Sequence, residues 1–241
     1  MTGLTTRGLW VVVAVLAVVL FGAVWAAGSG PSAGPAVPTG SVRLGPDPGQ
    51  DVAGYLSSLP AQLPPPGERV PALVQLGQPL DARAVAALGA PGTTTAVLRV
   101  PLDRVQTALR FEPVTGTGDP VAALGVARER AAFAAEADAD RARRAVPDAA
   151  TPQARESLTR RAAVAAAEHR ALAGPGCRCV VALVVSADRA GLEALAGRDG
   201  VRAVQAAPPG TPGQALALSP LLPEQTTAAT PPPDDGPVPP G

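Results

Sequence analysis

The sequence predicts an α+β protein with an N-terminal transmembrane helix and an ectodomain in which two strand-helix-strand units flank an α-helical hairpin. Three observations lead to this prediction. Residues 9–27 form a run of 19 uncharged residues. Prolines are concentrated on both sides of a stretch at 68–207. Within that stretch, apolar residues first alternate, as in strands, and then recur at helical spacing.

Residues 9–27 have the length and composition of a membrane-spanning helix. At about 1.5 Å per residue they extend about 28 Å, which matches a hydrocarbon core of about 30 Å. Trp10 and Trp25 lie near the two ends, where tryptophan side chains anchor a helix at the membrane interfaces. We therefore predict that the chain binds the lipid bilayer through this segment.

The charges around the apolar run predict its orientation. Arg7 and the free amino terminus lie on one side, and the other side has no charge until Arg43. The positive-inside rule places residues 1–8 in the cytoplasm and the rest of the chain outside the cell membrane. A cleaved signal peptide is the competing interpretation. We prefer a retained anchor because the run exceeds a typical signal core of about 7 to 15 residues.

Proline-rich segments border the foldable stretch. Residues 28–67 contain nine prolines and residues 207–241 contain eleven, out of 29 in the chain. Such segments favour polyproline II, whose backbone stays hydrated. We therefore expect a linker at 28–67 and a disordered tail at 208–241. Pro237 to Pro240 fit the P-x-x-P pattern, but this pattern arises by chance in such tails, and we interpret the tail as a spacer.

Two similar units are expected inside the foldable stretch, each consisting of a strand, a helix and a strand. Asp81 can cap the helix of the first unit and Asp188 that of the second. In both units, large apolar residues follow the capping aspartate by four and seven positions, which suggests an internal repeat. The four strands are expected at 70–76, 96–100, 179–185 and 201–206.

Two such units in tandem predict a ferredoxin-like ectodomain over 68–207, with a four-stranded sheet and helices on one face. The nearly continuous apolar strand that begins at Cys179 would be central. The other face of the sheet would be covered by an insertion at 118–173.

That insertion is expected to be a helical hairpin. Asp119-Pro120 and Thr151-Pro152 are typical helix starts. A shorter helix at 102–109 would lead into it. Two ion pairs are expected at helical spacing along the hairpin: Asp140 with Arg144, and Glu156 with Arg160.

Composition excludes several classes of function. The chain has 20 basic and 20 acidic residues and no lysine, so it lacks the basic surface of a nucleic-acid-binding protein. The single histidine, His169, is expected to be an exposed helical residue. We find no nucleophile-elbow motif and no phosphate-binding glycine loop. The sequence therefore predicts a protein that is not an enzyme and has no cofactor and no metal site.

Cys177 and Cys179 are the one concentrated reactive feature. On an extended strand their Cα atoms would lie about 6.6 Å apart, near the upper limit for a disulfide, but the preceding Gly-Pro-Gly turn could shorten this distance. A local disulfide or buried thiols, a bond between chains, and redox catalysis all stay open. Metal binding is disfavoured because two cysteines and one distant histidine do not complete a tetrahedral site.

The segment 187–204, with a leucine-containing helix, a small turn and then Gly-Val-Arg-Ala-Val, resembles the last helix and strand of subtilisin propeptides. That resemblance implies a ferredoxin-like fold and a role as folding helper and inhibitor of a protease. The hairpin and Pro208-Pro209 depart from the family's pattern. The whole arrangement looks more like single-pass membrane proteins of high-GC Gram-positive bacteria.

These observations predict a membrane-anchored, extracytoplasmic protein of the cell envelope. Its expected function is protein interaction or assembly, with an envelope protein that the sequence does not identify as partner. A membrane-tethered protease inhibitor or folding helper is one alternative. A thiol redox protein that uses Cys177 and Cys179 is the other.

Overall fold

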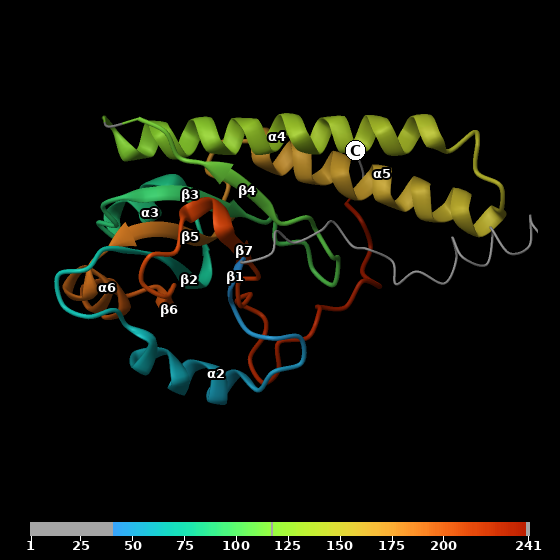
Figure 1. Ribbon diagram of the computed structural model, residues 1–241. Coiled ribbons are helices and arrows are strands. Elements are labelled where there is room, and N and C mark those ends of the chain that lie inside the picture. The colour runs from blue at the N-terminus through green and yellow to red at the C-terminus, as the bar shows by residue number, and fades with distance from the viewer. Residues whose placement is uncertain (1–40, 117, 240–241) are drawn as a thin grey trace, which may run out of the picture. The chain divides into compact units, whose positions relative to one another are not determined.

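The computed structural model describes residues 41–116 and 118–239 (Figure 1). The predicted transmembrane segment at 9–27, with Arg7, Trp10 and Trp25, lies outside the described residues, as does the first part of the predicted linker. In the described part of the chain, no helix combines the length and the apolar character needed to cross a bilayer.

The centre of the domain is a sheet of five strands in the order β4-β3-β5-β2-β6, and each strand is antiparallel to its neighbours. The expected position of β5 inside the sheet is confirmed. Its first six residues are all buried, which explains its continuous apolar sequence. The strands are β2 (Val70–Leu80), β3 (Thr93–Leu98), β4 (Arg110–Pro113), β5 (Val180–Ala187) and β6 (Val201–Ala206).

The two strand-helix-strand units are confirmed, and the protein is α+β. Helices α3 (Ala82–Ala87) and α6 (Arg189–Ala196) each begin after an aspartate whose carboxylate accepts a backbone N–H three residues on. The strands of one unit are not neighbours. β5 lies between β2 and β3, and β2 lies between β5 and β6, so the units interleave.

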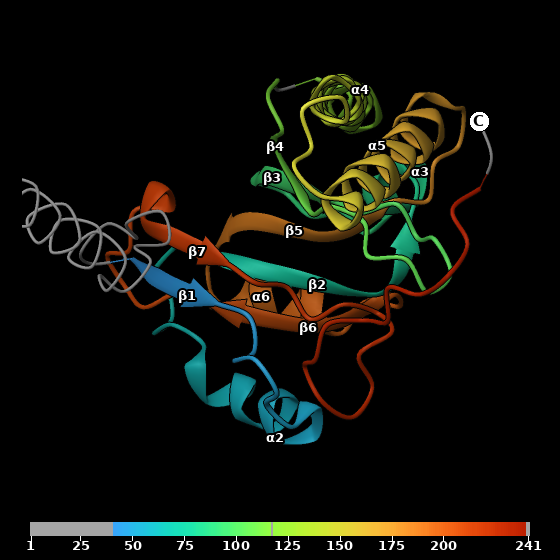
Figure 2. The ribbon, with the colours of Figure 1, turned by 90° about the vertical axis from the view of Figure 1, so that its right-hand side faces the viewer.

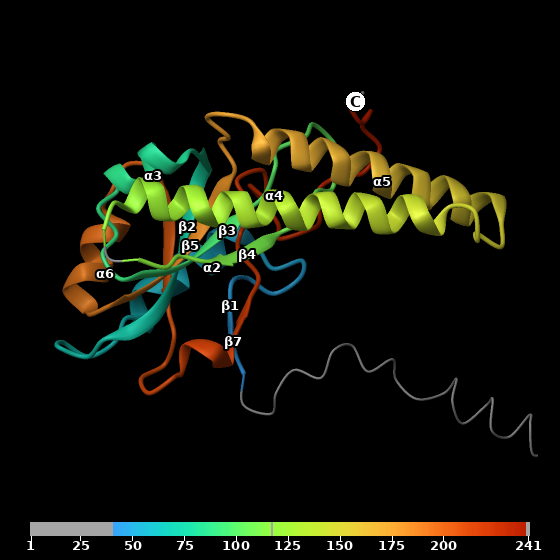
Figure 3. The same cartoon turned by 90° about the horizontal axis from the view of Figure 1, so that it is seen from above.

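The predicted hairpin is formed by α4 (Pro120–Ala145) and α5 (Pro152–Ala173), with Asp119 and Thr151 as caps. Its base packs near β4 and α3, and its turn projects beyond the sheet (Figures 1 and 3). We had expected the hairpin to cover the open face of the sheet, and it does not. Leu124 and Leu172 near its base join the same apolar cluster as Leu192 of α6, so it packs on the face that α3 and α6 already cover.

The opposite face of the sheet is covered by segments from both ends of the described chain (Figure 2). Two expectations about proline-rich segments are therefore wrong. Residues 41–62 are not a plain linker, and residues 208–239 are not a disordered tail, because Leu44, Tyr55 and Leu221 are buried against the sheet. The elements involved are β1 (Val42–Leu44), α2 (Val52–Ser58), the 3-10 helices η1 (Leu59–Gln62) and η2 (Gly213–Ala215), and β7 (Leu216–Leu218).

Buried hydrogen bonds explain how segments without regular structure are held. Gln75 on β2 donates to the Tyr55 hydroxyl at 2.8 Å and accepts from the backbone N–H of Leu221 at 2.7 Å. The Tyr55 hydroxyl donates to the Gln205 side chain at 2.9 Å, which also accepts from the N–H of Gly45. Because a buried polar group without a partner costs about 1–3 kcal/mol, these contacts select one position for each segment.

The predicted helix at 102–109 is absent. These residues form an open loop between β3 and β4. Pro101 precedes it, and Arg104 has a φ of 52°, a left-handed conformation that a right-handed helix does not allow. Because the loop lacks the internal hydrogen bonds of a helix, its backbone N–H groups and carbonyls are available to other segments.

Candidate protein-interaction site

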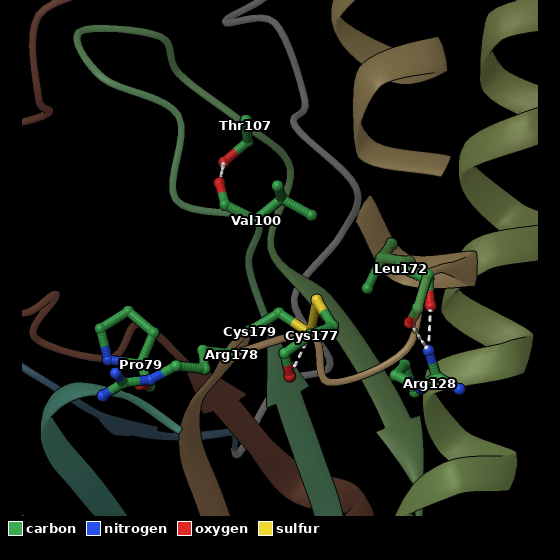
Figure 4. The surroundings of a disulfide bond; sticks show 9 residues. Pro79, Val100, Thr107, Arg128, Leu172, Cys177, Arg178 and Cys179 are labelled. Atoms are coloured by element: carbon green, nitrogen blue, oxygen red, sulfur yellow. Dashed lines mark hydrogen bonds between the residues drawn. A yellow bond between two sulfur atoms is a disulfide. The ribbon is translucent and has the colours of Figure 1, made fainter. Parts of the chain in front are cut away.

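The cysteine pair forms a disulfide between Cys177 and Cys179, with Cα atoms 5.4 Å apart (Figure 4). Gly176, at a φ of +71°, turns the chain just before the bridge, which explains why this distance is shorter than that of an extended strand. Cys179 is fully buried beside Val100 and Leu172, and Cys177 is half-buried. The bridge therefore closes a local turn at the start of β5.

A buried ion pair that the sequence analysis missed lies between β4 and the hairpin. Arg110 donates to Glu168 of α5 at 2.6 Å and to Asp138 of α4 at 3.0 Å. The side chains of Arg110 and Glu168 are only 9% and 3% exposed. Alternation along β4 would have been the available signal, since it turns Arg110 and Glu112 toward the helices.

The same ion pair fixes the loop between β3 and β4. The second carboxylate oxygen of Glu168 accepts from the backbone N–H of Ala108 at 2.6 Å. One residue earlier, the Thr107 hydroxyl donates to the Val100 carbonyl at 2.6 Å and closes the base of the loop (Figure 4). Because the first contact is partly buried and the second fully buried, the loop presents its remaining backbone groups in a fixed arrangement.

Residues 231–236 of the tail lie against this loop and the first half of α5. We call the surface formed by residues 103–106 and Arg160 the tail groove, and residues 231–236 the outer tail. Figure 1 shows the chain running up toward α5 in red. The proline-rich sequence of this segment predicted no contact, because it contains no information about a loop more than 100 residues away.

The two aspartates of the outer tail are held by separate groups. The Asp234 carboxylate accepts from the backbone N–H of Gln106 at 3.0 Å and from Arg160 at 3.1 Å. The Asp235 carboxylate accepts from the Arg104 guanidinium. Arg160 therefore bonds to the tail. The helical spacing had predicted a pair with Glu156 instead.

Backbone groups of the outer tail are also bound. The Gln106 side chain donates to the carbonyl of Pro232 at 2.7 Å, and the N–H of Gly236 donates to the carbonyl of Arg104 at 2.7 Å. A Cβ atom on Gly236 would lie 2.3 Å from the carbonyl oxygen of Asp103. The groove therefore accepts a glycine after the two aspartates and excludes larger residues.

The electrostatics match this geometry. The hydrogen bond from the Gln106 N–H, assisted by Arg160, lowers the pKa of Asp234. The hydrogen bond from Arg104 and the charge of its guanidinium lower the pKa of Asp235, and the same pair raises the pKa of Arg104. Both carboxylates are thus held in the ionised form, which is the form that the groove binds.

Two other predictions about the hairpin are corrected. His169 is half-buried, and its Nδ1 lies 3.0 Å from the carbonyl oxygen of Ala132 on α4, where we had expected an exposed residue. Asp140 pairs with Arg143 and not with Arg144. The position of His169 follows from the packing of α4 and α5 along their length. The Asp140–Arg143 pair lies within α4, where a residue three positions away is as near as one four positions away.

Within residues 41–116 and 118–239, no three His, Cys, Asp or Glu side chains gather as a metal site would require. Next to the outer tail lies a cavity of about 630 Å³ that Gln106, Arg110, Arg160 and Glu168 help to line. Its guanidinium and amide groups can bind carboxylates and peptide carbonyls. No family model, curated protein or solved structure matches the chain.

Proposed function

We propose that this chain is a non-enzymatic protein-interaction module of the cell envelope, anchored by residues 9–27 with Arg7 on the cytoplasmic side. The observation that carries this proposal is the tail groove. A fixed loop and one helix together bind an extended peptide segment through two carboxylate contacts and several backbone contacts. This combination of main-chain and side-chain contacts is how peptide-binding domains recognise their ligands.

The fold supports the proposal. The order β6-β2-β5-β3, all antiparallel, is the interleaved order of a ferredoxin-like sheet, and β4 adds a fifth strand at one edge. We infer that the domain is ferredoxin-like. In this arrangement the hairpin, the loop before β4 and the tail are additions to a compact core, and the tail groove is formed by these additions alone.

The proposed function can be tested by photo-crosslinking in living cells. A photoreactive residue would replace Ser157, which is exposed on α5 and lines the cavity beside the groove. A matched control would carry the same residue at Arg83, which is exposed on α3. One discrete envelope protein crosslinked at 157 and not at 83 is expected. No adduct at 157, with or without the outer tail, would overturn the proposal.

The anchor and its orientation are tested separately. Cell fractionation followed by immunoblotting should find the full-length chain in the membrane fraction. Protease added outside intact cells should degrade the domain and leave the amino terminus protected. Shortened protein found only in the medium would show that residues 9–27 are a cleaved signal peptide and not an anchor.

A thiol redox protein is the second candidate, because Cys177 and Cys179 are paired and Cys177 is half-buried, not fully enclosed. The bridge closes a loop of three residues, which is too short to stabilise much, about 1.6 kcal/mol by the loop-entropy relation. This leaves room for a chemical role. Unchanged disulfide exchange after both cysteines are replaced by serine would eliminate this candidate.

A protease inhibitor or folding helper is supported by the strand order, which agrees with the fold that the propeptide resemblance implies. The propeptide resemblance implies that the tail after β6 would enter a protease cleft. In the structure, residues 219–229 pack on the chain's own sheet. The full chain is expected neither to bind nor to slow an envelope subtilase, and measurable inhibition would promote this candidate over the first.

A further inference from the structure

The inner and outer parts of the tail are held in different ways. We call residues 219–229 the inner tail. It is anchored in the fold: Leu221 is fully enclosed, and the backbone of Ala229 bonds at both its N–H and its carbonyl to residues 49 and 50. The outer tail, by contrast, lies on the surface. The side chains of Arg104 and Asp235 are 53% and 63% exposed, and such pairs in water contribute little.

An exposed segment that follows a buried anchor stays close to its site even when it is released. Only Thr230 separates Ala229 from the first proline of the outer tail. The local concentration of the outer tail at the groove is therefore high, and modest contacts are enough to keep it bound. These contacts are also weak enough for another molecule with the same groups to replace it.

The groove specifies the chemistry of such a molecule. Gln106 and Arg160 bind one carboxylate, Arg104 binds the next, and the close approach of Gly236 to Asp103 requires a glycine after them. Prolines before this sequence keep the peptide extended at low entropic cost. Pro232 and Pro233 line a second cavity, of about 500 Å³, together with Leu102.

The geometry of Arg104 supports a binding role. It has the only positive φ among the described residues other than glycine, at 52°. This conformation directs both its carbonyl and its guanidinium to the outer tail. Strained backbone at a surface loop persists only where the surroundings hold it, and here the fastening of the loop through Thr107 and Ala108 does so.

We propose that the tail groove is a recognition site for extended, proline-flanked Asp-Asp-Gly segments of a partner protein, and that the chain's own outer tail occupies it as a competing ligand. This inference rests on the proposed interaction function and names the ligand of the same site. A partner binds when its segment displaces the outer tail, so the tail sets a threshold for binding.

The test is a binding titration with a fluorescent peptide that has the sequence of residues 230–239. The full chain in detergent micelles would be compared with a chain that ends at Thr230. The peptide is expected to bind the shortened chain at least tenfold more tightly than the intact one. A peptide with asparagine at both aspartate positions should bind the shortened chain about tenfold more weakly, because it loses the charge-assisted contacts.

Matched variants locate the binding. Arg160→Ala in the shortened chain should weaken peptide binding several-fold, whereas Arg155→Ala, an exposed arginine on the same helix, should not change it. If the shortened chain fails to fold, the full chain with Asp234→Asn and Asp235→Asn serves instead. It should bind the peptide several-fold more tightly than the unchanged chain, because its own tail competes less.

Several outcomes would overturn the inference. They are a peptide that binds neither chain, equal binding to the intact and shortened chains, and binding that ignores the aspartates or Arg160. Self-association that disappears with the outer tail would show that the tail exchanges between copies and would also overturn it. A crosslinked partner at position 157 without peptide binding would leave the interaction function standing and remove only this ligand.

Discussion

The two faces of the five-stranded sheet are covered by different kinds of structure. One face carries α3, α6 and the base of the hairpin, and its contacts are apolar. We call it the helical face. The other, the terminal face, carries segments from both ends of the described chain, and their positions are fixed by a buried network of Gln75, Tyr55 and Gln205. Helices and strands satisfy their backbone N–H and carbonyl groups within the regular hydrogen-bond pattern. Irregular segments need hydrogen-bond partners on the sheet for these groups.

The largest expected effect compares one leucine from each face. Leu192 of α6 and Leu221 of the inner tail are both fully buried. Replacing either with alanine should lower the free energy of unfolding by about 3 kcal/mol, through lost apolar contact and a cavity. Denaturant unfolding measures the loss, with Phe133→Ala as control, since that side chain is 71% exposed and its removal should be nearly neutral.

Hydrogen exchange would distinguish the two faces further. Leu192→Ala should raise exchange throughout the sheet, because α6 belongs to the cooperative core. Leu221→Ala should in addition raise exchange more strongly at one place, in residues 219–229 and in α2, because these segments pack together. Uniform exchange in both variants would show that the terminal face is as cooperative as the helical face.

This comparison also separates what the sequence could predict from what it could not. Alternation, helical spacing and the capping aspartates Asp81 and Asp188 predicted the strands and helices, because these signals are local and come from apolar burial. The cover of the terminal face depends on contacts such as Gln205 with Gly45, 160 residues apart. Proline content correctly indicated little regular structure, but it does not tell whether an irregular segment is packed.

The candidate site was hidden for the same reason. The sequence indicated Cys177 and Cys179 as a candidate site, because they lie two positions apart in the chain. It did not connect Arg104 or Arg160 with Asp234 and Asp235, since no periodicity relates a loop, a helix and a tail. Helical spacing paired Arg160 with Glu156 instead, which shows that a local rule yields to a tertiary contact.

Tyr55 provides a pH-dependent test of the terminal face. Burial raises its pKa from 10.0 to about 12, although the hydrogen bond from Gln75 acts in the opposite direction. The folded state therefore keeps the phenol neutral while the unfolded state ionises it. Stability is unaffected below pH 10 and falls between pH 10 and 12, by up to nearly 3 kcal/mol at about 1.4 kcal/mol for each pH unit.

The chain makes this test unusually clean, because it has one tyrosine and no lysine. Tyr55→Phe should cost about 1 kcal/mol at neutral pH, through the lost hydroxyl contacts, and should abolish the decline between pH 10 and 12. Denaturant unfolding at several alkaline pH values measures both effects. A decline that persists in the variant would contradict the assignment to Tyr55.

An effect smaller than the alkaline decline is expected from Gln75→Leu. The leucine keeps the size of the side chain but leaves the Tyr55 hydroxyl without its donor and the Leu221 N–H without its acceptor. We expect a loss of about 2 kcal/mol, concentrated on the terminal face, since buried groups without partners cost about 1–3 kcal/mol. Leu73→Met, on the same face of β2, is the control, because it keeps the size of a buried side chain and removes no hydrogen bond. A loss with normal protection of residues 219–229 would contradict the proposed role.

The smallest expected effect concerns the outer tail, which lies beyond both faces. The pKa values of Asp234 and Asp235 are lowered in the folded state, so their contacts contribute above the ordinary range near 4 and are lost as the pH falls through the lowered values. Acidification should therefore release residues 231–236 while residues 219–229 stay in place. A fluorophore attached at residue 238 would report the release as increased mobility. The chain with both aspartates changed to asparagine should be mobile at all pH values. Its outer tail lacks the charge-assisted contacts, and it has no carboxylate there that titrates. If the unchanged chain showed equal mobility at neutral and acidic pH, the ionised aspartates would not be what holds the outer tail in the groove.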